Sequence, residues 1–488
     1  MIKLSFFGGV NEIGGNKILL EADGTKIFLD FGMSFNKHTS YWAEYMTPRK
    51  LNGINDFIEF GMLPKIDGIY RKDYLQHTGM KYEDTPAVDG VLLSHGHMDH
   101  VGYVHFLRDD IPIFCSEATK MIMKAIQDVG AGTFNDLVQI ATSFQFKPKK
   151  DGKGHSRVYG EESYKDRPVN TFTFGKRFKI GNLEIEPVHI DHSLPGATAF
   201  IIHTSEGAVV YTGDIRFHGR RAELSEKFIE SARNAEPEIL ITEGTRIMEK
   251  DWETEEDVER KAGEVVKKTK ELAIVNFPGR DTDRLITFLN VAKATGRKLA
   301  IESRIAYLLE LLKGTDSIHV PSVDDDSIRI YMMRKGWGLI DRVDFPDEIR
   351  KGDYEKWEQK YMGHDNLVTW KDVRDSQKDF IFYCNFFQLK ELIDVRPKEG
   401  SNYIRSLVEP FSEDMELDEK RVNNWMKHFG LYPMHQIHAS GHAPGTEIKR
   451  MIAEMKPKKV IPVHTQHPKE FKKIVGKETK VEFAKLNV

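Results

Sequence analysis

Three histidines and one aspartate lie within six residues, directly after a short apolar run. The run is Val91–Leu93, and it leads into Ser94-His95-Gly96-His97-Met98-Asp99-His100. A short apolar run bounded by glycines is typical of a buried strand, and a tight turn after a rigid strand directs alternate side chains toward one point. Neutral imidazole and ionised carboxylate are the ligands that a borderline-soft divalent ion prefers. The stretch therefore predicts a metal-binding loop, with a surface histidine cluster as the alternative.

Cysteine usage restricts the ligands of any metal site. Cys115 and Cys384 are the two cysteines of the 488-residue chain, and both lie in apolar surroundings. That pattern is typical of buried, reduced thiols rather than of disulfides or a thiolate site. The metal ligands must then be His, Asp or Glu. Apolar runs are too short for a membrane span and the start lacks a signal-peptide pattern, so we expect a cytoplasmic protein without membrane contact.

The charge balance limits how a polyanion can bind. The chain has 71 Lys and Arg against 75 Asp and Glu, a net charge of -4. This excludes a uniformly basic surface. A polyanionic substrate would have to bind in a local positive groove or at the metal ions themselves.

Residues of metal-ligand type recur at the ends of later predicted strands. The alternating stretch 171–211 predicts an antiparallel sheet; His192 lies at the edge of one of its strands, and Asp214 follows the last one. Strand ends bring distant ligands together on one rim of a sheet. Asp30 also ends an apolar strand, where an aspartate is usually a turn residue unless other evidence links it to a ligand.

Residues 8–16 form a glycine-rich turn with the sequence GGVNEIGGN. The turn does not match the phosphate-binding pattern G-x-x-x-x-G-K-[ST], and no helical pattern follows it. We predict a tight connection that passes near the site.

The sequence predicts two domains, one inserted in the other. After residue 245, a helix over 254–270 with a capping-box start is followed by alternating strands and helices, which indicates a parallel sheet. A new cluster of histidines follows near the end. We therefore expect residues 1–245 to begin the first domain, residues 246–402 to form the inserted α/β domain, and residues 403–488 to complete the first.

The full series of motifs resembles known families. His95-x-His97-x-Asp99-His100, His192 and Asp214 are similar to the ligand series of the metallo-β-lactamase superfamily, an αββα sandwich. Glu243-Gly244-Thr245, HASGHA at 438–443 and Pro462-Val463-His464 resemble the further motifs of the β-CASP nucleases, which carry an inserted α/β domain. Within that group, GGVNEIGGN and Ser440-Gly441-His442-Ala443 most resemble ribonuclease J. The implied fold class is an α/β sandwich with an inserted domain that contains a mainly parallel sheet.

The resemblance implies two zinc ions per chain, with Mn²⁺ or Mg²⁺ as substitutes. It assigns the ligands as His95, His97 and His192 for one ion, Asp99, His100 and His464 for the other, and Asp214 as the bridge. Asp99 and Asp214 are thereby catalytic as well. The resemblance makes His442 the general acid and Glu243 the residue that orients it. It implies that His438, Ser440 and His442 bind the substrate phosphate, and that Asp30 orients a ligating imidazole.

The implied function is a ribonuclease that binds single-stranded RNA. It would act as a 5′-to-3′ exonuclease with additional endonuclease activity, leave 5′-phosphate products, and be compatible with a homodimer. Three alternatives stay open: a cleavage-and-polyadenylation-type RNA endonuclease, a small-molecule hydrolase of the same superfamily, and a non-catalytic RNA-binding protein.

Two pairs of side chains are candidates for direct RNA contact. Arg280 and Arg284 lie at a predicted strand-to-helix junction, where the backbone N–H groups of a helix start favour phosphate. We expect one of the two to contact RNA, and an ordinary salt bridge on the helix surface is an equally good interpretation. Phe386 and Phe387 are candidates for base stacking, but we favour burial in the core for both.

Overall fold

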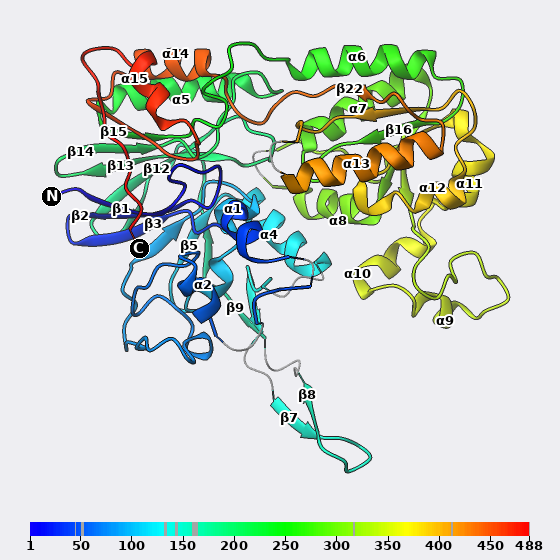
Figure 1. The fold of residues 1–488 in the computed structure, drawn as a ribbon, viewed down its shortest axis with the longest axis horizontal. Coiled ribbons are helices and arrows are strands. Elements are labelled where there is room, and N and C mark those ends of the chain that lie inside the picture. Colours follow the sequence, from blue (N-terminus) through cyan, green and yellow to red (C-terminus); the bar gives the residue numbers. More distant parts are fainter. Residues whose placement is uncertain are drawn as a thin grey trace.

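The computed structural model describes residues 1–43, 45–49, 53–130, 134–141, 145–158, 164–315, 318–410 and 413–487. Within these ranges, three sheets have six or seven strands each. Two of them lie at the left of Figure 1, and the third lies at the right together with most of the helices from Glu255–Lys268 (α6) to Glu413–His428 (α13). Two short hairpins pair Gln139–Ala141 (β6) with Tyr164–Asp166 (β9) and Gln145–Pro148 (β7) with His155–Val158 (β8).

The first sheet contains the strand that precedes the histidine loop. Its strands, in spatial order, are Lys3–Gly8 (β1), Lys17–Ala22 (β2), Thr25–Leu29 (β3), Gly90–Leu92 (β4), Ile113–Cys115 (β5) and Val169–Thr171 (β10). β1 to β3 pair antiparallel, and β4, β5 and β10 join in parallel. The short buried strand predicted before the loop is therefore confirmed as β4.

The second sheet joins residues from both ends of the chain. Its strands, in spatial order, are Phe178–Ile180 (β11), Leu183–His189 (β12), Thr198–Thr204 (β13), Gly207–Tyr211 (β14), Pro237–Thr242 (β15), Lys459–Pro462 (β23) and Lys480–Val481 (β24). β11 to β14 are antiparallel, as the alternating pattern predicts. β23 pairs in parallel with β15, so the C-terminal segment returns to this sheet.

The third sheet is parallel in every pairing between its described strands. Its strands, in spatial order, are Leu367–Val368 (β19), Ile328–Tyr331 (β18), Lys298–Glu302 (β17), Phe380–Tyr383 (β20), Ala273–Asn276 (β16), Asn402–Arg405 (β21) and His435–Gln436 (β22). The chain leaves this sheet only after β22, although we place the end of the inserted domain at residue 402. The three-segment division stays a proposal.

Helices connect and cover these sheets. The α-helices are Phe35–Tyr41 (α1), Asn55–Glu59 (α2), Met98–Val101 (α3), Glu117–Val129 (α4), Ala222–Asn234 (α5), Glu255–Lys268 (α6), Thr282–Thr295 (α7), Ser303–Leu312 (α8), Asp347–Lys351 (α9), Lys356–Gln359 (α10), Trp370–Asp375 (α11), Glu391–Val395 (α12), Glu413–His428 (α13), Gly445–Met455 (α14) and Phe471–Ile474 (α15). The 3-10 helices are Lys72–Tyr74 (η1), Val104–Phe106 (η2), Lys360–Gly363 (η4), Gln377–Asp379 (η5), Phe386–Gln388 (η6) and Pro468–Glu470 (η7). No described helix has both the length and the apolar character that a membrane span requires.

The first two sheets and the helices that cover them form four layers. One apolar cluster contains side chains of both sheets, such as Leu92 and Ile241, so the sheets pack face to face. The outer face of the first sheet packs on α4 through Met123. The outer face of the second packs on α5 and α14 through Phe228 and Ile448. The αββα sandwich that the sequence predicts is confirmed.

The third sheet is covered on both faces, as a parallel sheet requires. Phe288 of α7 belongs to the cluster on one face, and Leu392 of α12 to the cluster on the other. The capping box predicted at the start of α6 is present, with Thr254 as N-cap and Asp257 as its partner. α8 packs on α4 through Leu308 and Ile122, which joins this part of the chain to the sandwich.

Candidate metal centre

The histidine loop leaves β4 and enters α3, and this places its four metal-type side chains. His95 and His97 lie in the loop, with His97 as the N-cap residue of α3, while Asp99 and His100 belong to the first turn. Gly96 lies against α4, where a Cβ would approach Ile122 Cγ2 to 2.6 Å. Close packing of the loop on α4 therefore requires glycine at this position.

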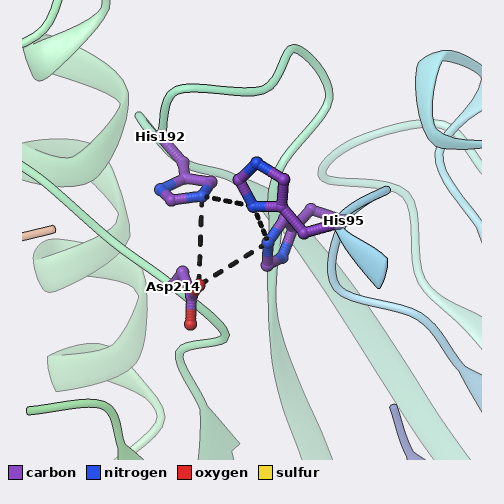
Figure 2. A group of neighbouring side chains, drawn as sticks. His95, His192 and Asp214 are labelled. Carbon is purple, nitrogen blue, oxygen red and sulfur yellow. Dashed lines mark hydrogen bonds and ion pairs between the residues drawn. The ribbon is translucent and has the colours of Figure 1, made fainter. Parts of the chain in front are cut away.

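Four ligand atoms converge in the first half of the site (Figure 2). His95 Nε2 and His97 Nδ1 are 2.9 Å apart, and His192 Nε2 lies 3.3 Å from the same His97 nitrogen. Asp214 Oδ2 lies 3.6 Å from His95 Nε2. Nitrogen and oxygen atoms that all face one point in this way match the donor set of a divalent ion.

The second half of the site shares Asp214 with the first. His100 Nε2 lies 3.3 Å from Asp214 Oδ2, and His464 Nε2 lies 3.2 Å from Asp99 Oδ2 and 3.7 Å from Asp214 Oδ2. Asp99, His100 and His464 thus form a second group of potential ligands. The seven ligands expected from the sequence come together in space, although they span 370 residues of chain from His95 to His464.

Burial prepares the first three histidines to bind a metal. It lowers the pKa of His97 to about 4 and the pKa values of His95 and His192 well below the usual range. All three rings are therefore neutral at physiological pH, which is the form that ligates a metal. Burial opposes ionisation of Asp214, but the neighbouring histidines, His100 first, hold its pKa well below normal, so it is a carboxylate.

Two buried ligand atoms have no hydrogen-bond partner in the described structure. They are Asp214 Oδ1 and His100 Nε2, which lies 3.3 Å from Asp214 Oδ2 within the centre. A buried polar atom without a partner costs about 1–3 kcal/mol, so such atoms are rare without a ligand. A cation in the centre would satisfy His100 Nε2. The residues present therefore fit divalent ions.

Further side chains hold His100 in place. Its Nδ1–H donates to Asp30 Oδ2 at 2.7 Å, and Asp30 also accepts hydrogen bonds from the Ser94 hydroxyl at 2.8 Å and the Tyr211 hydroxyl at 2.5 Å. Asp30 adopts a left-handed backbone with φ of 57°. Such strain in a non-glycine residue costs about 1–3 kcal/mol, and it occurs mostly at functional sites. Sequence reasoning identified Asp30 but missed Ser94 and Tyr211, because no local pattern links them to His100.

His464 is held by a contact that the sequence also did not reveal. Its Nδ1 lies 2.8 Å from the Thr245 hydroxyl, which leaves Nε2 to face Asp99. The backbone of His464 is left-handed, with φ of 50°, and its N–H donates to Gly9 O at 2.8 Å. The glycine-rich turn therefore passes along the site, as predicted. A Cβ on Gly14 would approach Asp99 Oδ2 to 2.6 Å.

His442 and Glu243 form a pair beside the metal ligands. Nδ1 of His442 donates to Glu243 Oε2 at 2.9 Å, and Ile215 N–H donates to Oε1 at 2.8 Å. Burial opposes protonation of His442, but the Glu243 and Asp214 carboxylates outweigh it and raise its pKa to about 9. At neutral pH this ring holds a proton that it can transfer. A third group of potential metal ligands joins Asp214 and His464 to this pair.

His438 and Ser440 lie in the segment that leads to His442. The His442 N–H donates to the Ser440 hydroxyl at 3.2 Å, and the Ser440 carbonyl lies 3.0 Å from His218 Nε2. Arg284 donates to His438 Nδ1 at 3.1 Å, so Nε2 carries the ring proton. Burial and the Arg284 charge lower the pKa of His438 to about 3, which keeps the ring neutral. His192 also contacts this segment, since its Nδ1–H donates to Gly441 O at 2.6 Å.

The candidates for direct RNA contact differ in their exposure to solvent. Arg284 is fully buried and donates to Glu255, Ser406 and Ala439, so its predicted contact with RNA is wrong. Arg280 is only partly buried. The preference for a buried Phe387 is also wrong, because this side chain is 83% exposed. It lies at the start of a short 3-10 helix, where no periodic pattern indicates which ring faces solvent.

Two family descriptions match parts of the chain. Residues 67–263 match the beta-lactamase superfamily domain, and residues 433–473 match the RNA specificity domain of Zn-dependent metallo-hydrolases. The first match contains the histidine loop, His192 and Asp214. The second contains His438, Ser440, His442 and His464, which are the late motifs of the sequence.

Whole-chain similarity extends over both parts of the molecule. Ribonuclease J of Pyrococcus abyssi is 23% identical over 498 residues, which covers 95% of this chain and 90% of that protein. Ribonuclease J of Helicobacter pylori is 26% identical over 215 residues, or 44% of this chain and 23% of that protein. The crystal structure of a protein of unknown function from Enterococcus faecalis V583 shares the fold, with a TM-score of 0.72 at 21% identity over 100% of this chain and 99% of that one.

Proposed function

We propose that this homologue of ribonuclease J, which contains a beta-lactamase superfamily domain, is a zinc-dependent ribonuclease that hydrolyses single-stranded RNA from the 5′ end and can also cut internally. The observation that carries the proposal is the His442–Glu243 pair at 2.9 Å, beside two groups of metal ligands that share Asp214. The match of residues 433–473 to an RNA specificity domain of metallo-hydrolases supports RNA as the substrate.

The ligands divide between two ions in this proposal. His95, His97 and His192 would hold one zinc, Asp99, His100 and His464 would hold the other, and Asp214 would serve both. When bound, such ions polarise a phosphoryl oxygen, activate water, and offset the charge that develops on phosphorus. Mn²⁺ or Mg²⁺ would substitute through the same nitrogen and oxygen ligands.

In this proposal His442 supplies the proton that the leaving group needs. Water attacks phosphorus and releases one proton to solvent, while the bond from phosphorus to the 3′ oxygen breaks and His442 gives its proton to that leaving oxygen. His442 then takes up a proton from solvent, which restores its starting state. The products are a 3′ hydroxyl on one piece and a 5′ phosphate on the other. Glu243 accepts the Nδ1–H bond of His442 and so holds the ring during the transfer. Proton transfer by a positioned side chain contributes about 100- to 10,000-fold to the rate.

The substrate phosphate lies beside the 438–442 segment in this proposal. His438 offers its Nε2–H because Arg284 occupies Nδ1, and Ser440 offers a hydroxyl. Asp30 orients His100 through their 2.7 Å hydrogen bond. We also propose, from the family resemblance alone, a cytoplasmic location, a homodimer, and a domain division at residues 245 and 402.

A small-molecule hydrolase is the second candidate, because the superfamily domain alone is compatible with it. The late histidine segment argues against this alternative. A small ester or lactone needs no phosphate-binding histidine pair, whereas His442 lies against the His192 and His464 rings with His438 four residues before it. The family matched over that segment is described by RNA specificity.

The direct test is to incubate the purified protein and zinc with an RNA labelled separately at each end. The RNA carries either a 5′ monophosphate or a 5′ triphosphate. We expect single nucleotides to be released from the 5′ end, faster from the monophosphate, together with some internal products that bear 5′ phosphates. Hydrolysis of generic esters without RNA cleavage would support the small-molecule alternative instead.

A further inference from the structure

The third sheet presents the ends of two neighbouring strands toward the metal centre. β16 and β20 pair in parallel, so their carboxyl ends lie at the same edge of the sheet. The chain continues from β16 through residues 277–281 into α7. The first turn of α7 contacts the metal-binding part of the molecule, because Arg284 donates to Ala439 O at 2.9 Å and Asp283 accepts from Arg216 at 2.6 Å.

Arg280 differs from the other arginines of this region. Arg216, Arg221 and Arg284 all form ion pairs with buried carboxylates. Arg280 makes no hydrogen bond or ion pair with any residue of the described chain, although it is partly buried. Arg280 lies directly before Asp281, the N-cap residue of α7, and Arg284 in the first turn of that helix donates to Ala439 O in the late histidine segment. A partly buried cation without a partner is expensive, and an anionic ligand would stabilise it.

Phe387 lies at the end of the neighbouring strand. Its N–H donates to Asn385 Oδ1 at 2.9 Å, and Asn385 Nδ2 donates to the Tyr383 hydroxyl at 3.3 Å. That hydroxyl lies 3.0 Å from where a Cβ on Gly279 would be, directly before Arg280. The backbone of Phe387 and the residue before Arg280 therefore both lie close to the Tyr383 side chain, at the same edge of the sheet.

We propose that Arg280 and Phe387 form one binding surface for an RNA strand that enters the metal centre: the guanidinium contacts a backbone phosphate and the ring stacks on a base. The inference rests on the proposed function. Single-stranded nucleic acid is bound by this combination in general, with a cation along the backbone and an aromatic platform for the bases. The net charge of -4 makes a local cation necessary for this contact.

The two contacts have separate signatures in a binding experiment. We would measure fluorescence anisotropy of a hydrolysis-resistant phosphorothioate oligoribonucleotide with the zinc-loaded protein at several salt concentrations. Loss of one phosphate contact on a single strand reduces the slope of log K against log salt by about 0.7, which we expect for Arg280→Met. Loss of one stacked base weakens binding by about fivefold to a hundredfold, which we expect for Phe387→Ala without a change of slope.

Matched variants separate these effects from general ones. Arg260→Met removes an exposed arginine of α6 that pairs with Asp257, and Trp337→Ala removes an exposed ring elsewhere in the same part of the chain. We expect both to bind RNA like the wild type. Phe387→Trp should retain binding, because stacking needs a flat ring and not phenylalanine itself.

An oligonucleotide series with one abasic position gives the sharpest test of stacking. At one position, the abasic RNA should bind wild type and Phe387→Ala equally, because the base that stacks is absent. Equal affinity and equal salt slope for wild type, Arg280→Met and Phe387→Ala would overturn the inference while RNA binding itself persists. If the wild type binds no RNA at any salt concentration, the proposed function fails, and the inference fails with it.

Discussion

The Nδ1–H of His442 donates to the carboxylate of Glu243 at 2.9 Å, and the same carboxylate accepts the backbone N–H groups of Ile215 and Thr245. Glu243 directly follows the second-sheet strand β15, whereas His442 comes from the late segment after β22. The carboxylate is thus fixed by the sandwich, and it fixes the ring. In the proposed mechanism this relationship makes the pair a positioned proton donor.

Glu243→Gln should therefore slow the reaction without weakening RNA binding. The amide keeps the shape of the side chain but removes the charge that favours the imidazolium form of His442. We expect kcat to fall by about 10- to 100-fold, the typical effect of losing a group that acts through a neighbour, with KM nearly unchanged. Glu249→Gln, a change at an exposed glutamate, is the control. A full loss of RNA affinity in Glu243→Gln would contradict this role.

Thr245→Val tests the support of His464. The substitution keeps the size of the side chain but removes the oxygen 2.8 Å from His464 Nδ1. Loss of such a contact typically lowers metal affinity by about 10- to 100-fold. Zinc titration against a competing chelator measures this effect, with Thr39→Val on the exposed helix α1 as the control. Unchanged zinc affinity would show that the hydroxyl does not orient the ligand.

Arg284→Met tests the buried charges between the two parts of the molecule. The change leaves Glu255 without its 2.9 Å partner. Removal of one member of a buried pair costs about 3–5 kcal/mol, whereas the exposed control Arg260→Met should cost at most about 1 kcal/mol. Urea unfolding followed by tryptophan fluorescence measures both. If Arg284→Met were as stable as the wild type but bound RNA more weakly, the direct contact between Arg284 and RNA would be supported after all.

The lowered pKa of buried Lys17 predicts a specific dependence of folding stability on pH. Its ammonium donates to the carbonyls of Gly15 and Gly32, but burial lowers its pKa to about 7; Glu12 opposes that shift, and Lys37 adds to it. Between pH 7 and 10.5 the unfolded chain binds more protons at this position, so folding stability should rise with pH across that window.

We expect this contribution to be absent from Lys17→Met, in which no group titrates. The difference in free energy of unfolding between wild type and variant should therefore increase in favour of the wild type from pH 7 toward pH 10. Equilibrium unfolding at pH 7, 8, 9 and 10 measures it. Curves that stay parallel over this range would mean that Lys17 keeps its ordinary pKa.

Local patterns in the sequence were enough to predict a metal-binding loop after a short strand, whereas the full ligand set and the four layers came from the family resemblance. His95 to His100 lie within six residues after a strand, and Thr254 with Asp257 forms a capping box that spans four residues. Both depend on neighbours along the chain, where periodicity and side-chain type carry the information. The insertion was predicted for the same reason, because the strand and helix pattern changes after residue 245.

Contacts between distant residues could not be predicted in this way. Tyr211 reaches Asp30 across 181 residues, and Thr245 reaches His464 across 219. No local pattern marks Tyr211, and the motif that contains Thr245 does not indicate which histidine this hydroxyl contacts. Arg280 and Arg284 occur in similar sequence surroundings, and only the fold shows that the Arg284 guanidinium binds Glu255 and Ser406.

The measurement that tests the central claim most directly is metal content and RNA cleavage in His464→Ala. His464 Nε2 lies 3.2 Å from Asp99 Oδ2, and His464 is the last residue of the second group of potential ligands. We predict that wild type holds two zinc ions per chain by mass spectrometry of the metal, that His464→Ala holds one, and that the variant loses cleavage of end-labelled RNA. A His464→Ala protein that binds two ions and cleaves RNA at the wild-type rate would contradict the account.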